Sequence, residues 1–249
     1  MRFAVEELKQ KIFEAQNSIF RNILKSKFPP TLGIKMQFLG NKYSGYWFPE
    51  IFLHSKGSVW GVGLGHDSSF ERKLVEFGYD FCGFEPEFDS YRASSKEFRG
   101  LPVVLENYGL WDKSGYFKYT GENISIVNIF KLKEFSENQL EIRSLWEVAA
   151  EKKIKDYSTP RVLKLNIEGA EREILLRMVV EPLEFEILIF QAEFLFHVGI
   201  KRIVEKISAF KDLQRILQGL TIQGWEVIDF SRHQITIINS NLLQGKREQ

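Results

Sequence analysis

The spacing of apolar and polar residues is helical near the start of the chain and becomes strand-like from residue 58 onward. Residues 3–27 carry apolar side chains three or four positions apart with charges between them, which predicts an amphipathic helix. Pro29 and Pro30 end that helix, because proline cannot continue it. Residues 31–53 are aromatic and irregular. They indicate either a lid or substrate wall or, as we prefer, simple packing.

From residue 58 the chain alternates between short apolar runs and amphipathic segments. The runs predict strands at residues 58–63, 79–85, 101–110, 161–168 and 185–194. The segments predict helices at residues 69–77, 88–99, 140–153, 170–178 and 199–218. Residues 225–230 and 234–240 are close enough in sequence to pair as a hairpin. This order predicts an α/β fold with a doubly wound, mostly parallel sheet and a C-terminal antiparallel edge strand.

Neither a repeat nor a low-complexity linker divides the chain. We therefore expect one domain over residues 1–249, with residues 1–30 as an N-terminal helical extension and residues 58–240 as the core.

Composition narrows the expected partners and location. Lys plus Arg number 34 and Asp plus Glu 33, so no strong field attracts nucleic acid or an anionic membrane, and we expect neither partner. Cys82 is the one cysteine, which excludes an intrachain disulfide and indicates a buried, inert thiol in a reducing compartment. Apolar runs fall short of the about 18 residues that a membrane span needs, and acidic residues interrupt residues 1–11 where a secretory signal would be apolar. We expect a soluble, cytoplasmic protein.

A glycine-rich turn follows the first predicted strand of the core. Gly61, Gly63 and Gly65 alternate through it, and glycine allows a backbone to approach a ligand closely. The spacing lacks the third glycine of a dinucleotide fingerprint, because Ser68 or His66 stands where that glycine is needed. The turn suits a ligand with an amino acid end, such as S-adenosylmethionine, whose ammonium group Asp67 could face. Alternatively, the turn is purely structural, with Asp67 or Ser68 as the N-cap of the next helix.

An acidic residue ends the second predicted strand. Glu85 lies 24 residues after Gly61 and is followed by Pro86, which marks a strand end. A carboxylate there can accept hydrogen bonds from both ribose hydroxyls of an adenosine cofactor. The glycine turn and the acidic strand end together favour such a cofactor at the carboxyl edge of the sheet.

The fourth predicted strand ends in polar residues just before a helix, at the same edge. Asn166 could hold the acceptor or the transferred group, and Glu168 could accept a proton from the acceptor. Both Glu168 and Glu171 could instead complement the helix dipole, which is the role we prefer for Glu171.

These segments together resemble the FkbM family of S-adenosylmethionine-dependent methyltransferases. The matching segments are GLGHDSSFE at residues 63–71, GFEP at residues 83–86, GLWDKSG at residues 109–115 and LKLNIEGAE at residues 163–171. Weaker agreement continues from QAEF at residues 191–194, so the resemblance covers roughly residues 40–240. It implies a seven-stranded class I methyltransferase fold, S-adenosylmethionine as cofactor with S-adenosylhomocysteine as product, and O-methylation of a sugar or small-metabolite hydroxyl.

By position, the resemblance also implies roles for individual residues. The expected cofactor-binding set is Gly61, Val62, Gly63, Gly65, Asp67, Glu85, Pro86, Gly109 and Leu110. Asn166 and Glu168 would border the reacting methyl group, although the family pattern has aspartate where Asn166 stands. Asparagine cannot act as a base, which leaves Glu168, Glu193 and His197 as base candidates. A lone histidine beside Phe194 and Phe196 is more often packed than catalytic.

Other readings of the sequence remain open. The remaining histidines, His54, His66 and His233, are too scattered to suggest a metal site. A nicotinamide-dependent oxidoreductase could use a similar sheet, but the missing third glycine counts against it. Asn166 supports another alternative, a methyltransferase-like protein that binds cofactor or a partner without turnover.

Overall fold

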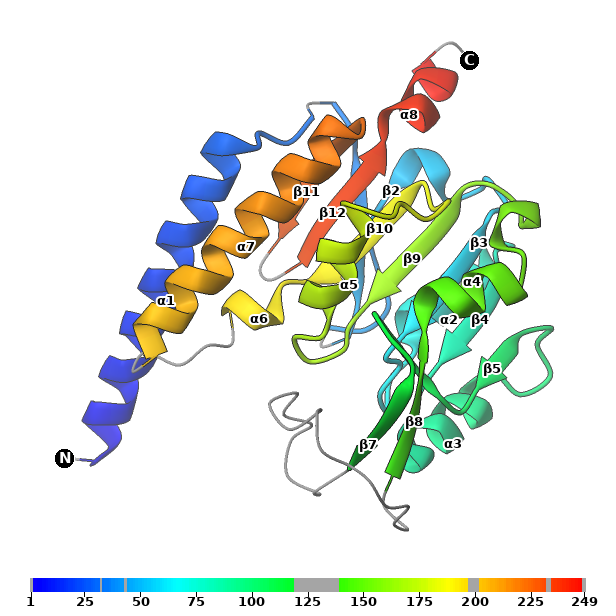
Figure 1. Ribbon diagram of the computed structural model, residues 1–249, viewed down its shortest axis with the longest axis horizontal. Helices are drawn as coiled ribbons and strands as arrows, with labels where there is room; N and C mark the ends of the chain where they lie inside the picture. The colour runs from blue at the N-terminus through cyan, green and yellow to red at the C-terminus, as the bar shows by residue number, and fades with distance from the viewer. Residues whose placement is uncertain are drawn as a thin grey trace.

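The computed structural model describes residues 2–31, 33–42, 44–118, 139–196, 202–231 and 234–247. Its centre is a seven-stranded sheet in the order β11-β12-β10-β9-β3-β4-β5 (Figure 1). The strands are β3 (Ser58–Val62), β4 (Asp80–Phe84), β5 (Val104–Glu106), β9 (Arg161–Leu165), β10 (Ile187–Gln191), β11 (Trp225–Ser231) and β12 (Gln234–Asn239). The predicted α/β, mostly parallel fold is confirmed.

The terminal hairpin forms as expected, but its antiparallel strand lies one place in from the sheet edge. β12 pairs antiparallel with both β10 and β11, so β11 becomes the edge strand. The burial pattern explains the order. β12 is buried at five successive positions, whereas exposure alternates along β11. A strand that is apolar on both faces belongs inside a sheet.

Two layers cover the sheet, because successive side chains of each strand point to opposite faces. Trp60 and Leu163 belong to the core shared with α4 (Leu145–Glu151), α5 (Glu171–Met178) and α7 (Ile203–Ile222). Val59 and Val162 belong to the opposite core, beneath α2 (Ser69–Glu76) and α8 (Ser240–Arg247).

The N-terminal helix α1 (Arg2–Lys27) forms as predicted and lies beside α7 and α6 (Glu193–Phe196) (Figure 1). Phe20 stacks on Phe210 of α7 with ring centroids 4.7 Å apart, and the Asn17 side chain donates to the backbone O of Phe196 at 3.1 Å. Leu24 is fully buried in the main core. These contacts attach residues 17–24 of the helix to the core.

Three segments differ from the sequence expectation. Residues 31–53 include a hairpin, β1 (Met36–Leu39) with β2 (Tyr46–Pro49), whose Tyr46 and Phe48 are buried beside α2. The predicted strand 101–110 is two strands, β5 and β6 (Gly109–Trp111), separated by Asn107 and Tyr108. β6 joins β8 (Gln139–Ser144) and β7 (Gly115–Lys118) in a separate sheet, so part of the predicted helix 140–153 is strand.

The remaining helix of the core, α3 (Phe88–Glu97), begins after the end of β4. Glu87 caps it, since its carboxylate accepts from the backbone N of Asp89 at 3.0 Å and of Ser90 at 2.6 Å. In the part of the chain that the structure describes, none of the helices combines the length and apolar character needed to cross a bilayer.

Candidate cofactor and acceptor site

The glycine turn leaves the carboxyl end of β3, and two of its glycines have left-handed backbone conformations. Gly63 has φ of +73° and Gly65 has φ of +60°, a region that side chains other than glycine rarely adopt. A Cβ at Gly63 would overlap the backbone O of Asn166, whereas a Cβ at Gly65 would meet no atom within 4 Å. Gly63 is therefore required by close packing against the β9 end, and Gly65 presents bare main chain to open space.

Glu85 connects the end of β4 to this turn. Its Oε2 accepts hydrogen bonds from the backbone N of Leu64 at 2.9 Å and of Gly65 at 2.8 Å. Its Oε1 accepts from the backbone N of Glu87 at 2.9 Å. Burial raises the pKa of Glu85, while these backbone donors and the Lys164 ammonium act in the opposite direction. Because each carboxylate oxygen can accept two hydrogen bonds, Oε1 keeps capacity for a ligand hydroxyl.

The other expected cofactor residues take different positions. Gly61 and Val62 are buried within β3, where a Cβ on Gly61 would lie 3.0 Å from Leu64 and Phe81 side-chain atoms. Asp67 precedes α2. Its Oδ1 accepts from the backbone N of Ser69 at 3.0 Å, and its Oδ2 accepts from the Asn41 side chain. The local bonds at Asp67 are those of a helix start.

Pro86, Gly109 and Leu110 lie beyond the turn on the β4 side. A Cβ on Gly109 would be 3.1 Å from the Pro86 ring, and Leu110 is buried in β6. Asn107 donates to the backbone O of Glu85 at 2.9 Å and so ties this segment to the acidic strand end. The structure thus brings Glu85, Pro86 and Gly109 together, and their cofactor role stays a prediction.

The turn after β9 carries the predicted reacting residues. The backbone N of Asn166 donates to Val62 O at 3.0 Å, and the side-chain Oδ1 of Asn166 is buried without a hydrogen-bond partner. Glu168 is exposed and has φ of +55°, which is strained for a residue other than glycine. A Cβ on the next residue, Gly169, would lie 3.7 Å from Phe194, so this turn packs against the start of α6. Asn166 and Glu168 therefore share one end of the site with α6.

Glu193, the first residue of α6, is buried at this end of the sheet. Burial and the Glu168 carboxylate raise its pKa to about 7, while Lys164 acts to lower it. A carboxyl group with that pKa can exchange a proton near neutral pH, as a general base requires.

Glu171, which we expected to complement the helix dipole, is the first residue of α5. It is completely buried, and its Oε1 accepts from the backbone N of Ile167 at 3.3 Å. Burial and the Glu193 carboxylate raise its pKa well above the usual range. The backbone N–H groups of Ile167, Gly169 and Glu171 act in the opposite direction, and the dipole role of Glu171 stays a prediction.

Sequence reasoning did not assign Lys164 and Tyr46, two buried residues of the same region, to the candidate site. Lys164 of β9 pairs with Glu71 of α2, with Nζ 2.9 Å from Oε1, and also donates to the backbone O of Gly63 at 2.9 Å. Tyr46 of β2 lies beneath it, and the Tyr46 hydroxyl accepts from Gln191 Nε2 at 2.9 Å. A lysine within an otherwise apolar strand was the sequence signal for this network.

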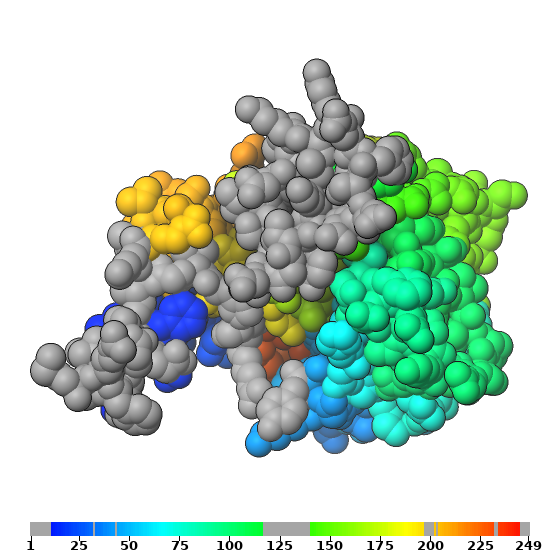
Figure 2. All heavy atoms as spheres, turned by 90° about the horizontal axis from the view of Figure 1, so that it is seen from below, coloured from blue at the N-terminus to red at the C-terminus, as the bar shows by residue number. Residues whose placement is uncertain are grey.

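The parallel strands run toward the lower edge of Figure 1, so Figure 2 views their carboxyl ends. On the visible face, blue and cyan residues of the β2 to β3 region lie next to yellow and red residues of the later strands (Figure 2). His197, the remaining base candidate, lies outside the described residues. Within the described ranges, no group of three or more His, Cys, Asp or Glu side chains is arranged to hold a metal ion.

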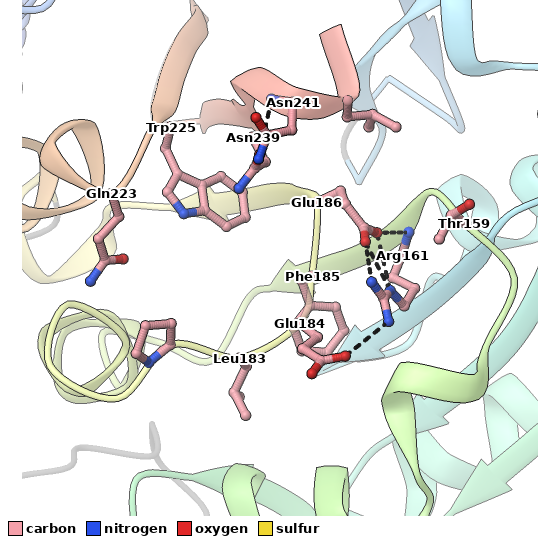
Figure 3. A pocket seen from close by; sticks show the side chains of 12 residues that line it. Thr159, Arg161, Leu183, Glu184, Phe185, Glu186, Gln223, Trp225, Asn239 and Asn241 are labelled. Carbon is pink, nitrogen blue, oxygen red and sulfur yellow. Dashed lines mark hydrogen bonds and ion pairs between the residues drawn. The ribbon is translucent and has the colours of Figure 1, made fainter. Parts of the chain in front are cut away.

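A pocket of about 510 Å³ opens at the opposite edge of the sheet, around the start of β9 (Figure 3). Its Arg161 guanidinium binds Glu186 and also lies 3.3 Å from Glu184 and 3.1 Å from the backbone O of Lys155. Trp225, from the start of β11, forms another part of the wall. The charged groups of this pocket already satisfy one another, and open α/β sheets bind ligands at the other edge.

No protein-family model matches the sequence, and no curated protein matches it either. Solved structures do match. A methyltransferase from Pyrococcus furiosus is 13% identical, with 91% of this chain and 97% of that chain covered and a TM-score of 0.38. A protein assigned as an rRNA methylase from Clostridium thermocellum is 12% identical, with 74% and 85% covered and a TM-score of 0.40. A protein assigned as a tRNA (m1A22) methyltransferase from Streptococcus pneumoniae, crystallised with S-adenosyl-L-methionine, is 14% identical, with 75% and 66% covered and a TM-score of 0.38.

These matches correct one expectation. The balanced net charge led us to exclude nucleic acid as a partner, yet two of the similar structures are named for methylation of rRNA and tRNA. A balanced total charge therefore does not exclude nucleic acid for a protein of this architecture, and the exclusion is wrong. Similarity at this level does not identify a substrate.

The strand order and the helices on both faces are those of a class I methyltransferase fold.

Proposed function

We propose that this protein is an S-adenosylmethionine-dependent methyltransferase of the FkbM type that methylates a hydroxyl group of a sugar or small metabolite. The observation that carries the proposal is the bond from Glu85 to the glycine turn, which places a buried carboxylate beside the open main chain of Gly65. This arrangement fits an adenosine cofactor with an amino acid end. Glu85 Oε1 would hold the ribose, and the turn would lie against the methionine part.

S-adenosylmethionine supplies a methyl group activated by a positively charged sulfur. The residues of this chain would hold the acceptor hydroxyl close to that group and in line with it, which is worth several kcal/mol of the barrier in oriented reactions. Glu193 would accept the hydroxyl proton, with Glu168 beside it at the mouth of the site. Asn166 would orient the acceptor through its side-chain oxygen, which makes no other hydrogen bond.

A buried base supports an oxygen acceptor, because a hydroxyl must lose its proton during transfer whereas a neutral amine can attack with its lone pair. General base catalysis typically contributes about 10²–10⁴-fold. The carboxyl groups at the acceptor end therefore favour hydroxyl methylation over methylation of a neutral nitrogen.

Isothermal titration calorimetry with S-adenosylmethionine, S-adenosylhomocysteine and NADH tests the cofactor. We expect both sulfur compounds to bind and NADH to give no heat. Glu85→Gln should weaken binding, whereas Glu87→Gln should not, because Glu87 contacts Glu85 through its backbone N and uses its side chain to cap α3. Failure of both sulfur compounds to bind the folded wild-type protein would overturn the proposal.

The acceptor is tested by transfer of a radiolabelled methyl group to a panel of sugars, small metabolites and RNA. Label on a sugar or metabolite oxygen supports the proposed class, and label found only on RNA contradicts it. Tight cofactor binding without product from any acceptor would favour a binding protein that has lost turnover.

A further inference from the structure

Lys164 occupies a position where the strand pattern calls for an apolar side chain. It lies in the central strand β9, in register with Gly61 of β3 and Ile189 of β10, and is 2% exposed. Burying an ammonium group is costly unless it is paired and hydrogen-bonded. The contacts of Lys164 must therefore offset that cost.

Three groups from different elements surround the Lys164 ammonium. Glu71 Oε1 of α2 and the backbone O of Gly63 each lie 2.9 Å from Nζ, and the ring centroid of Tyr46 lies 5.1 Å away. Burial alone would lower the pKa of Lys164, but Glu71 and the other neighbours outweigh burial and leave the pKa raised. The lysine stays charged, and one of its hydrogen bonds goes to the turn that would hold the cofactor.

The glycine turn is consequently held on two sides. Glu85 accepts from its N–H groups at Leu64 and Gly65, while Lys164 donates to its carbonyl group at Gly63. The peptide group between Gly63 and Leu64 is therefore held at both ends, since its carbonyl O accepts from Lys164 and its N–H donates to Glu85. Lys164 thus sets the shape of the turn from beneath.

The same charge acts on the acceptor end of the site. Glu193 faces Glu168 in the β9–α5 turn, Glu171 at the start of α5, Tyr46 on β2 and Lys164 on β9. Of these groups, Lys164 is the one that favours the charged form of Glu193. Glu168 and burial favour the protonated form.

We propose that Lys164 is a positioning residue whose bond to Gly63, held by Glu71 and Tyr46, fixes the glycine turn for the cofactor. This inference rests on the proposed function. It adds that cofactor binding depends on one buried ammonium group.

Two readouts on the full chain test the inference. The first is the dissociation constant of S-adenosylhomocysteine, measured by calorimetry. The second is the titration midpoint of the Glu193 carboxyl group, followed by ¹³C NMR of glutamate-labelled protein and assigned through the signal lost in Glu193→Gln. The second readout needs neither cofactor nor acceptor.

Lys164→Met should weaken S-adenosylhomocysteine by about tenfold or more, the scale of one lost hydrogen bond to a charged group, and should move the Glu193 midpoint to higher pH. Lys164→Arg should keep the midpoint, because it keeps the charge. Lys152→Met is the matched control. Lys152 is a partly exposed lysine that, like Lys164, forms an ion pair, with Glu106 at 2.5 Å, and its replacement should change neither readout.

Lys164→Met leaves Glu71 buried without its partner, so the double variant Lys164→Met with Glu71→Gln guards against loss of folding. Melting curves confirm that each variant is folded. An unchanged dissociation constant for S-adenosylhomocysteine in the folded double variant would overturn the inference. If wild-type protein binds no S-adenosylhomocysteine, the proposed function fails. The inference about the cofactor then fails too. The Glu193 midpoint in that case shows only whether Lys164 changes the pKa of that carboxyl group.

Discussion

The backbone N–H of Gly65 donates to Glu85 across the ends of two neighbouring strands, at 2.8 Å. The same carboxylate oxygen accepts from Leu64, so the side chain directly after β4 fixes the turn that follows β3. The strand end and the turn therefore form a single unit.

Glu85→Gln tests this unit. The amide can replace at most one carboxylate oxygen as acceptor, so buried N–H groups of the turn lose partners, at a cost of about 1–3 kcal/mol. We expect a lower midpoint in urea unfolding and weaker S-adenosylhomocysteine binding. Unchanged values for both would show that the hydrogen bonds to Leu64 and Gly65 contribute nothing.

Gly63→Ala should be more harmful than alanine at another glycine with positive φ. Gly63 combines φ of +73° with direct overlap of a Cβ on Asn166 O, whereas Gly100 has φ of +81° and open space around it. Backbone strain alone costs about 1–2 kcal/mol, so Gly100→Ala measures strain without overlap. We expect Gly63→Ala to cost clearly more in thermal unfolding and to abolish cofactor binding. Equal costs would contradict the packing described at the β9 end.

Stability should fall with rising pH through the range in which Glu193 ionises. Its pKa in the folded protein is about 7 against a usual value of 4.5, so the folded state holds this proton more tightly than the unfolded state. The contribution is fully present below about pH 4.5 and is lost as pH rises through 7, up to about 3 kcal/mol in total because one pKa unit is worth about 1.4 kcal/mol. Denaturant unfolding of wild type and Glu193→Gln between pH 5 and pH 8 measures the difference, and parallel pH profiles would contradict the assignment.

Catalytic activity should increase with pH as Glu193 ionises, whereas stability decreases. A base works when it is ionised, so methyl transfer should rise with pH around 7, and Glu193→Gln should reduce kcat by about 10²–10⁴-fold. Glu181→Gln, on the exposed surface beyond α5, is a suitable control. A pH-independent rate with full activity in Glu193→Gln would exclude Glu193 as the base.

Asn166→Ala separates folding from function. The side-chain oxygen of Asn166 has no hydrogen-bond partner, so its removal should cost less than about 1 kcal/mol of stability. If Asn166 orients the acceptor, kcat should nevertheless fall while cofactor affinity stays close to wild type. Steady-state kinetics and calorimetry on the same preparation give both quantities, and unchanged kcat would remove Asn166 from the acceptor site.

Strong periodicity made most of the fold predictable. The strands ending at Val62, Phe84 and Leu165 and the long helix α1 follow directly from apolar spacing and from proline and glycine positions. Residues 101–110 did not, because only Glu106 and Asn107 interrupt the apolar run at the point where the chain leaves one sheet for another. The local sequence pattern shows which residues are apolar, but it does not show which sheet a strand joins.

The site was predictable where one residue type carries the signal and hidden where burial decides. Glycine spacing and an acidic strand end identified Gly63, Gly65 and Glu85 from sequence. The raised pKa of Glu171 could not be predicted from sequence, because its neighbour Glu193 comes from a different helix and only the fold brings the two carboxyl groups together. Lys164 was visible as a polar residue in an apolar strand, but its partners on α2 and β2 were not.

The position of β12 has a consequence for biosynthesis. β10 pairs on its outer side with the strand at Gln234–Asn239, so a nascent chain that has emerged only to residue 231 leaves that side of β10 without its partner. Unpaired apolar strands recruit other chains. Premature termination between residue 231 and the end of β12 should therefore yield aggregates. Loss of residues after β12 leaves every strand of the sheet paired.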